Sequence, residues 1–356
     1  MRGCVVGGGL AGSLLAWRLS RAEPWRVDLL APTGPDATTA SGGAVRGYEE
    51  DPGQRQLAAE SLSELLASPT LCRWAGYRAT EAVCLRPDAT GLAEAVADID
   101  AALPGSAELV DRPGLERQGW AGLHDGAVGL RERRAGYLSP GRFRDALLAD
   151  CARRRVSIRD SRIATVALRD DGRLGCGGRV YDAVVLAVGP WTPGLLAAAG
   201  LPAAGYRTKA IQYAVHRVGD WRPPQFVDGV TGLFGRPTAD GGLLLGLPTE
   251  HWDVDPRHPV VDPALPAAAA DLVRARFPAL RLGAAAPPVA ASDCYAGTPG
   301  LRLRRVVGSH PLFTFTGGAG GSAKTALAAS ARAADQLTGS GPPAEASPVG
   351  RTEGRP

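Results

Sequence analysis

The chain has 356 residues, more than one hydrophobic core usually organises, so its length indicates two domains. Hydrophobic residues make up 45% of the chain and charged residues 21%, which is typical of a globular protein. The net charge of +4 is small, and no run of Lys and Arg forms a basic patch. We therefore expect no nucleic-acid partner.

The sequence contains no apolar run of the ~20 residues that a membrane span needs. Its N-terminal apolar segment is interrupted by glycines and lacks the pattern of a signal peptide. The six cysteines are scattered without a C-x-x-C pair, which argues against a zinc site and a disulfide framework. We expect a cytoplasmic protein that holds no metal and does not associate with membranes.

The N-terminus predicts a nucleotide-binding unit. Residues 3–19 predict a short apolar strand, a glycine turn and a helix, and residues 25–31 predict a second parallel strand. At the turn, Gly7, Gly9 and Gly12 form the pattern G-x-G-x-x-G. Such glycines permit a tight turn, close approach of a pyrophosphate and close helix packing. This context predicts a dinucleotide site, against the alternative of a coincidental glycine turn.

One feature of such sites is missing from the second strand. An acidic residue is expected at its end, about 20 residues after the turn, to bind the ribose hydroxyls. Ala31 stands at this point, while Asp28 comes three residues too early and Asp36 lies in the following loop. Ribose recognition is therefore left to the main chain and water, or to residues elsewhere.

The rest of the chain alternates between segments typical of an α/β domain and segments typical of an antiparallel sheet. Helical spacing begins at Gln54 and at Pro140, and the second helix is followed by short strands and an apolar strand that ends at Gly189. Residues 206–250 predict alternating strands of an antiparallel sheet. An apolar strand and a helix return from Phe313. We therefore expect an α/β fold, with a discontinuous Rossmann-type domain and an inserted antiparallel-sheet domain.

The glycine-rich segment that follows Phe313 resembles a nucleotide-triphosphate loop, G-x-x-x-x-G-K-[ST]. Gly318, Lys324 and Thr325 fit that pattern, but Ala323 stands where the loop requires glycine. The match therefore fails by one residue. The chain has only two lysines, Lys209 and Lys324, so the lysine after these glycines needs another explanation.

Three further segments, taken together with the N-terminal turn, carry a resemblance to a known family. They are TASGGAVRGY from Thr39, RRAGYLSPGRFRDALLADCARRRV from Arg133 and DAVVLAVGPWTPGLL from Asp182. The chain resembles the FAD-dependent D-amino-acid oxidase superfamily, and within it the monomeric sarcosine oxidase and glycine oxidase branch. The resemblance runs from residue 3 to residue 338, although residues 51–129 match only in style.

The resemblance implies an FAD bound in extended form, with its pyrophosphate at the first helix and its isoalloxazine ring at the junction with the substrate domain. The order of the predicted elements indicates an FAD-binding domain in three segments and a substrate domain in two, and the Pro/Gly/Ser-rich composition of the tail indicates disorder. The segments, in chain order, are FAD-binding 1–47, substrate 48–129, FAD-binding 130–205, substrate 206–295, FAD-binding 296–338 and tail 339–356. The residues expected to bind FAD are Gly7, Gly9, Leu10, Ala11, Gly12, Ser41, Gly42, Gly43, Ile163, Gly189, Trp191, Gly317, Gly318, Ala319, Gly320, Gly321 and Lys324.

In the same branch, a segment G-x-x-G-x-G-x-K follows the last core strand and its lysine helps to bind the substrate carboxylate. Residues 317–324 have this length, which assigns that role to Lys324; the alternative is a solvated lysine in an ordinary glycine loop. Arg46 aligns with the second carboxylate anchor, against the alternative of a surface arginine. Charged pairs there would orient the substrate toward the flavin.

Two tyrosines are further candidates for the active site. Tyr295 lies four residues before Pro299, at the position of an active-site tyrosine in sarcosine oxidases. Tyr48 is a second candidate, for which ordinary packing is an equal alternative.

Two departures from the pattern bear on the activity. Leu244 stands in the segment Gly242–Gly246 where sarcosine-oxidase-like enzymes place a lysine that promotes reaction with O₂. Those enzymes also attach the flavin to a cysteine two residues before the tyrosine, whereas Cys294 immediately precedes Tyr295. We therefore expect slow oxygen reduction and a non-covalent FAD, with Cys294 an ordinary buried cysteine.

The resemblance implies dehydrogenation of the C–N bond of a small amine or amino acid by hydride transfer to flavin N5, with O₂ or an unknown acceptor taking the electrons. One alternative is a flavin monooxygenase that uses NAD(P)H and O₂, although the segment TGGAGG lacks the acid usual in those enzymes. Another is a non-redox FAD-binding subunit whose partner completes the site.

Overall fold

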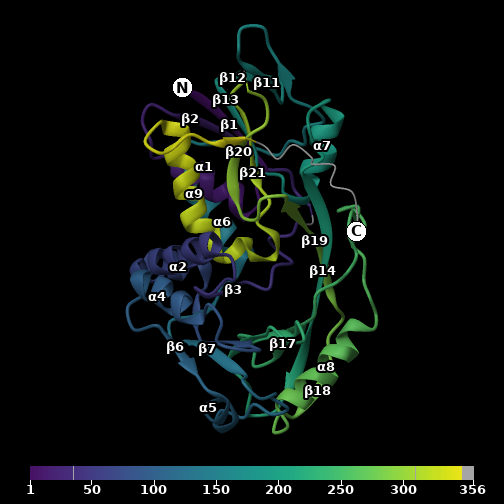
Figure 1. Cartoon of the computed structure of the whole chain (residues 1–356). Coiled ribbons are helices and arrows are strands. Elements are labelled where there is room, and N and C mark those ends of the chain that lie inside the picture. Colours follow the sequence, from purple (N-terminus) through teal and green to yellow (C-terminus); the bar gives the residue numbers. More distant parts are fainter. Residues whose placement is uncertain (35, 309, 347–356) are drawn as a thin grey trace.

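The computed structural model describes residues 1–34, 36–308 and 310–346. Its first part is built on a seven-stranded sheet in the order β22-β20-β21-β13-β1-β2-β9 (Figure 1). The run from β21 to β9 is parallel, whereas β20 pairs antiparallel with β21. The strands are β1 (Arg2–Val6), β2 (Arg26–Leu30), β9 (Ser157–Arg159), β13 (Ala183–Leu186), β20 (Arg302–Arg305), β21 (Leu312–Thr316) and β22 (Glu345–Ala346).

Helices cover this sheet because their apolar faces need a partner. Helix α1 (Leu10–Leu19) packs against α9 (Ser322–Thr338) and α6 (Pro140–Arg153), and α9 also packs against α2 (Pro52–Ala67). Leu14 and Leu29 are fully buried in the core that these elements share with the sheet. The β-α-β unit and the Rossmann-type sheet expected from the sequence are confirmed (Figure 1).

The second part is a nine-stranded sheet in the order β18-β14-β17-β16-β15-β5-β7-β6, with β19 also pairing with β14. Its pairs are antiparallel except for β15 with β5, so the expected antiparallel sheet is confirmed. The strands are β5 (Ala82–Arg86), β6 (Ala107–Val110), β7 (Val128–Glu132), β14 (Tyr206–Val218), β15 (Gln225–Asp228), β16 (Phe234–Pro237), β17 (Leu243–Gly246), β18 (Leu282–Ala285) and β19 (Val289–Ala296).

Strands β14 and β19 run side by side from one part of the molecule to the other (Figure 1). A second core, which includes the ring contacts between Trp120, Phe226 and Phe277, lies under the nine-stranded sheet. The remaining helices are α3 (Pro69–Ala75), α4 (Leu92–Ala102), α5 (Arg112–Arg117), α7 (Thr192–Ala198) and α8 (Leu265–Arg276), with 3₁₀ turns at Gly189–Trp191 and Ala319–Gly321. Two small sheets join β3 (Ala44–Val45), β8 (Gly136–Tyr137) and β4 (Arg78–Ala79), and β10 (Ala167–Leu168), β11 (Leu174–Cys176) and β12 (Arg179–Tyr181).

The C-terminal segment differs in part from expectation. Glu345 and Ala346, which lie in the expected disordered tail, form β22 on the edge of the first sheet. Arg302 and Glu345 form an ion pair at 2.8 Å that supports this pairing. The rest of the expected tail, residues 347–356, lies outside the described residues. The exact domain boundaries stay a prediction.

Candidate active site

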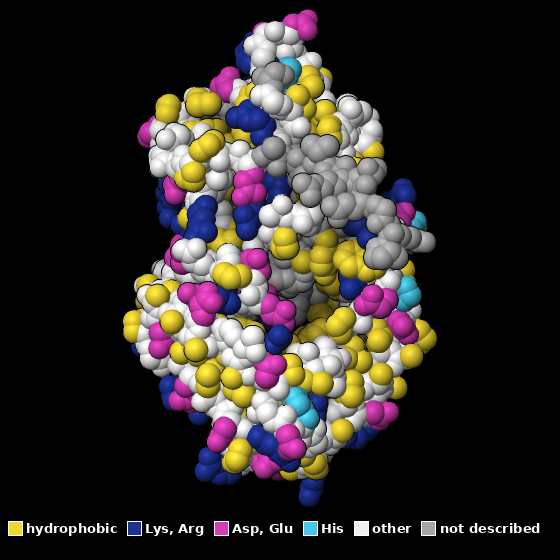
Figure 2. Space-filling model, in the orientation of Figure 1, with side chains coloured by type: hydrophobic (Ala, Val, Ile, Leu, Met, Phe, Trp, Pro, Cys, Tyr) yellow, Lys and Arg dark blue, Asp and Glu magenta, His cyan; other side chains and the backbone are white. Residues whose placement is uncertain are grey.

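A cavity of about 1360 Å³ lies between the two sheets, at the carboxyl ends of β1, β2, β13 and β21. Ligands of open α/β sheets bind at this edge, because the loops that follow the strands form a crevice there. On the opposite side, β14, β17 and β19 close the cavity with residues that include Lys209, Leu244 and Tyr295. Figure 2 shows this face of the molecule hollowed between its two parts, with hydrophobic side chains along the opening.

The glycine turn requires glycine for steric reasons. Gly7 has φ +113°, and a Cβ there would lie 2.3 Å from the carbonyl oxygen of Ala187. A Cβ on Gly12 would lie 2.0 Å from the carbonyl oxygen of Gly7, so α1 starts in direct contact with the turn. Gly9, Leu10 and Ala11 line the cavity at the N-terminus of α1. The turn, the helix N-terminus and the size of the cavity therefore fit a dinucleotide.

The acids near the second strand are divided between two sides of the sheet. Ala31 lines the cavity, as does Asp36, whose carboxylate accepts hydrogen bonds from Arg144 and from the Thr39 amide. Asp28 accepts a hydrogen bond at 2.7 Å from the Tyr181 hydroxyl, away from the cavity. Asp28 is therefore structural, and Asp36 is the acid of this region that the structure places at the cavity.

Most of the residues expected to bind FAD line the cavity. These residues are Gly7, Gly9, Leu10, Ala11, Ser41, Gly42, Gly43, Ile163, Gly189, Trp191, Gly317, Gly318, Ala319, Gly320 and Lys324. Gly12 lies behind the turn and Gly321 lies beside the Lys324 side chain, and neither is on the cavity wall. The three glycine-rich segments expected to surround the cofactor are therefore brought together by the fold.

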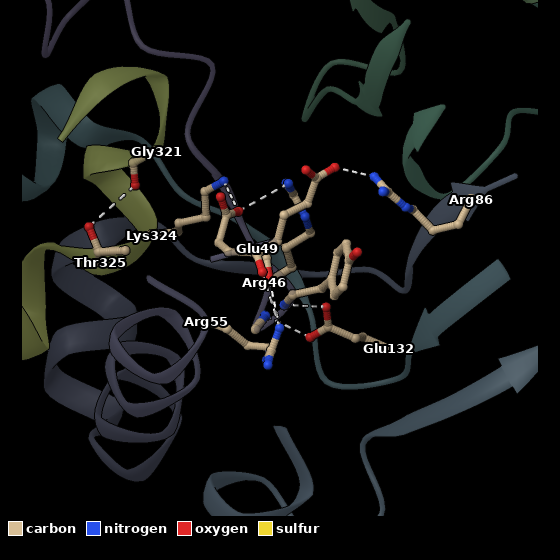
Figure 3. Close-up of polar contacts among 11 residues, drawn as sticks. Arg46, Glu49, Arg55, Arg86, Glu132, Gly321, Lys324 and Thr325 are labelled. Carbon is tan, nitrogen blue, oxygen red and sulfur yellow. Dashed lines mark hydrogen bonds and ion pairs between the residues drawn. The ribbon is translucent and has the colours of Figure 1, made fainter. Parts of the chain in front are cut away.

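A cluster of charges stands on the wall next to the last glycine segment (Figure 3). The Lys324 ammonium donates a hydrogen bond to Oε1 of Glu49, and the Arg46 guanidinium lies 3.2 Å from the same oxygen. Burial opposes ionisation of Glu49, but Lys324 and Arg46 outweigh it and hold the pKa of Glu49 below its ordinary value. Burial, reinforced by Arg46, lowers the pKa of Lys324 although Glu49 opposes the shift. The two expected carboxylate anchors thus share one carboxylate of the protein itself.

Two buried side chains fix the loop that carries Arg46 and Glu49. The carboxylate of Glu132 is fully buried and accepts hydrogen bonds from the amides of Gly47 at 2.6 Å and Tyr48 at 2.8 Å (Figure 3). Burial raises the pKa of Glu132 even though these amides oppose the shift. Arg55 donates to the carbonyl oxygen of Glu49 at 3.1 Å. These contacts hold the charged cluster in place against α9.

The two candidate tyrosines have different surroundings. Tyr295 lines the cavity, forms an isolated backbone bridge with Gly318 and stacks edge-on against Trp252, with ring centroids 5.0 Å apart. Burial raises the pKa of Tyr295 to about 12. Tyr48 is packed with Cys84 and other buried side chains and does not line the cavity. Ordinary packing, the alternative weighed for Tyr48, is what the structure shows.

Leu244 lines the cavity and is buried, at 3.6 Å from the position that a Cβ on Gly42 would take. Its neighbour across the sheet is Arg236, whose guanidinium donates to the carbonyl oxygen of Gly42 and lies 4.5 Å from the ring centre of Tyr137. Burial lowers the pKa of Arg236. A half-buried cation therefore lies beside Leu244, which the sequence pattern did not reveal.

Alternate residues of β19 face opposite sides. Asp293 and Tyr295 line the cavity on one face of β19, and Cys294 also borders it, but the Cys294 side chain is buried in a hydrophobic cluster, with its sulfur 3.8 Å from the carbonyl oxygen of Tyr295. Burial raises the pKa of Cys294 to about 11, which disfavours the thiolate. Among the described residues, none forms a hydrogen bond or ion pair with the Asp293 carboxylate, and burial raises its pKa to about 7.

The sequence matches the family of FAD dependent oxidoreductases (DAO) over residues 3–337. The chain belongs to this family. It is therefore an FAD-dependent oxidoreductase, and the residues that line the cavity fit that cofactor. The turn at Gly7 and the N-terminus of α1 would hold the pyrophosphate, and the segments around Gly42 and Gly318 would surround the rest.

Solved structures of related enzymes share the fold at low identity. Glycine oxidase from Geobacillus kaustophilus is 16% identical with a TM-score of 0.77, covering 99% of this chain and 100% of that one. L-proline dehydrogenase from P. horikoshii is 14% identical with a TM-score of 0.77, over 96% and 94% of the two chains. L-α-glycerophosphate oxidase from Mycoplasma pneumoniae, solved with FAD bound, is 15% identical with a TM-score of 0.78, over 95% and 94%. No curated protein matches the sequence.

Two expected absences concern membranes and metals. Within the described parts of the chain, no helix is long and apolar enough to cross a membrane. The same residues contain no group of three or more His, Cys, Asp or Glu side chains placed to hold a metal ion.

Several residues at the cavity of this FAD-dependent oxidoreductase could not be assigned from the sequence. Glu49 follows Arg46 by three positions, but only the fold brings it to Lys324, 275 positions away. Arg236 lies on a strand that the sequence predicts, whereas the strand that carries Asp293, β19, was not predicted, and the face that each residue presents depends on register. Strand alternation around Tyr295 is the one signal that points to Asp293, since residues two apart share a face.

Proposed function

We propose that the protein dehydrogenates the C–N bond of an amine or amino acid. FAD supplies the redox chemistry when bound, by accepting the hydride from the substrate carbon at N5. The observation that carries the proposal is the cluster of Lys324, Glu49 and Arg46, of which Lys324 and Arg46 line the cavity beside the glycine segment expected at the flavin. Charged groups at that place can bind and orient a small polar substrate.

The chain's own residues divide the remaining tasks. The charged cluster would hold the polar end of the substrate, and Tyr295 and the buried Leu244 would close the wall around it. The carboxyl of Asp293, which has no partner among the residues that the structure describes, suits an ammonium group, because an acid and an amine form a charge-assisted hydrogen bond. Low identity to an oxidase of glycerophosphate shows only a shared fold, so this acidic lining is what favours an amine.

Anaerobic titration of the purified yellow protein tests the proposal. We expect the flavin absorbance to bleach with some member of a panel of amines, amino acids and their amides, while glycerophosphate leaves it unchanged. Bleaching by NADPH alone would favour the monooxygenase, and bleaching by glycerophosphate alone would move the activity to C–O bonds. If the protein is a subunit that needs a partner, none of these compounds should bleach its flavin until the partner is added. After reduction, exposure to air shows whether O₂ is the electron acceptor.

A further inference from the structure

The position between Arg46 and Lys324 is already filled by a carboxylate of the chain. Glu49 Oε1 accepts from the Lys324 ammonium and lies 3.2 Å from the Arg46 guanidinium (Figure 3). The side chains of Lys324 and Arg46 are 10% and 12% exposed, so little of either cation is open to a further ligand. A cation pair that is buried against its own carboxylate is no longer an open anion site.

We propose that Glu49 is a specificity-determining residue, which fills the anion position between Arg46 and Lys324 so that the cavity accepts amines without a free carboxylate group. The inference rests on the proposed amine dehydrogenation and narrows its substrate class. The substrates it favours are amines whose carboxyl group is absent or is masked as an amide or ester.

The charges around the cluster support this selectivity. Arg46 and Lys324 share the carboxylate of Glu49, and the fully buried Glu132 holds the loop that carries Arg46. The carboxylate of Glu49 therefore offsets positive charge that would otherwise attract an anion. A free substrate carboxylate would have to displace Glu49 from both partners, and the displaced Glu49 would lose two charge-assisted hydrogen bonds.

The remaining charged groups on this wall do not reverse the balance. Asp293 contributes a carboxyl to the cavity lining that has no partner among the described residues. Arg236 is engaged by the carbonyl oxygens of Gly42 and Pro237, and Lys209 lies 3.6 Å from Glu250. An amide or ester can accept a hydrogen bond from Lys324 without competing for the charge.

A matched pair of ligands tests the inference by binding alone. Benzoate and benzamide have nearly the same shape and differ in charge, and their affinities for the FAD-loaded protein can be measured by calorimetry and by perturbation of the flavin absorbance. We expect benzamide to bind at least tenfold more tightly than benzoate. In the Glu49→Gln variant, Arg46 and Lys324 are free to bind the carboxylate of benzoate. The ratio of the benzamide affinity to the benzoate affinity should therefore fall at least tenfold.

Glu50→Gln is the matched control, because Glu50 is the next residue and borders the cavity but pairs with Arg86 and is 70% exposed. Its ratio should equal that of the unmodified protein. Equal or tighter binding of benzoate by the unmodified protein would overturn the inference, as would a Glu49→Gln ratio that does not change. If Glu49→Gln fails to fold, the ratio of benzamide to benzoate affinity in the unmodified protein still tests the inference.

Flavin reduction separates this inference from the proposed function. Reduction by free amino acids as readily as by their amides would overturn the selectivity and leave the C–N chemistry intact. If the protein shows the expected ratio of affinities but no amine reduces its flavin, the proposed function is refuted and the selectivity is not. If amides or simple amines reduce the flavin, and free amino acids do so at least tenfold less efficiently, the result would support both the proposed function and the selectivity.

Discussion

The Lys324 ammonium on α9 contacts the carboxylate of Glu49, 275 positions earlier in the chain. This contact joins the last helix of the FAD-binding part to the loop that follows β3, at the wall of the cavity. Arg46 lies against the same carboxylate, so the three groups form one electrostatic unit. Changes to any one of them should therefore depend on the state of the others.

The first prediction concerns this coupling. Lys324→Met leaves Glu49 with Arg46 alone, so we expect the free energy of unfolding to fall by about 1–3 kcal/mol. Adding Glu49→Gln removes the under-compensated carboxylate and should recover part of that loss. The effects should be non-additive by roughly 0.5–3 kcal/mol, as is usual for groups in one network. Urea unfolding of the FAD-loaded single and double variants measures this coupling.

The chain's second lysine provides the control for that experiment. Lys209 also lines the cavity, but its partner Glu250 lies 3.6 Å away and is 83% exposed. A pair with one exposed and distant partner contributes little, so Lys209→Met should change stability by less than about 1 kcal/mol. Strict additivity of Lys324→Met and Glu49→Gln would contradict the cluster described above.

The second prediction concerns pH. Burial raises the pKa of Asp293 to about 7, well above the ordinary value of an aspartic acid in an unfolded chain. Because folding favours the protonated form, the contribution of Asp293 to stability is complete below pH ~4 and is lost as the pH rises through about 7. Relative to Asp293→Asn, the unmodified protein should therefore lose stability between those values.

A spectroscopic titration checks the same group in the folded protein. Asp293 lies on the cavity wall across from Lys209 and next to Tyr295 on its strand face, so its ionisation places a negative charge at the cofactor cavity. The flavin absorbance should show a pH-dependent change near 7 that Asp293→Asn removes. A change of equal size in the variant would assign the titration to another group.

The sequence predicts which segments form helices and strands better than it predicts which side of a sheet each strand residue faces. The unit around Gly7 and Gly12 is visible because its glycines are dictated by contacts within a few residues of β1 and α1. Long-range pairing is not visible in this way. Glu132 contacts the amides of Gly47 and Tyr48, which are some eighty positions away, and nothing in the local pattern around any of these residues indicates the contact.

Strand register explains the other differences at the site. Asp28 is close to the expected position of the ribose acid, but alternation along β2 turns it to Tyr181, on the other side from the cavity. The same alternation packs the Cys294 side chain into a hydrophobic cluster, although Cys294 borders the cavity as Asp293 does. The tail was expected to be disordered from its composition alone, and composition does not reveal the edge of β20, with which Glu345 pairs.

The third prediction concerns the attachment of FAD. The Cys294 sulfur is buried in the hydrophobic cluster, and burial raises the pKa of its thiol to about 11, so it is a poor nucleophile toward a cofactor in the cavity. We expect the protein to purify yellow and to release FAD into the supernatant after acid precipitation. Cys294→Ser should release the same amount. Colour that remains with the precipitated protein would show a covalent bond, and mass spectrometry of peptides would then identify the attached residue.

The last prediction concerns oxygen. If Leu244 occupies the place of the oxygen-activating lysine, the reduced flavin of the unmodified protein should reoxidise slowly in air, and Leu244→Lys should accelerate that step by roughly tenfold, or ~1.4 kcal/mol of barrier. The new ammonium would be buried beside Arg236, so its pKa would fall and the acceleration should be largest at lower pH.

Leu244→Met fills similar space without a charge and should leave reoxidation unchanged. Stopped-flow mixing of the reduced proteins with oxygenated buffer gives the rates. Equal acceleration in Leu244→Met would assign the effect to packing, and fast reoxidation of the unmodified protein would show that Arg236 or another group already supplies the charge.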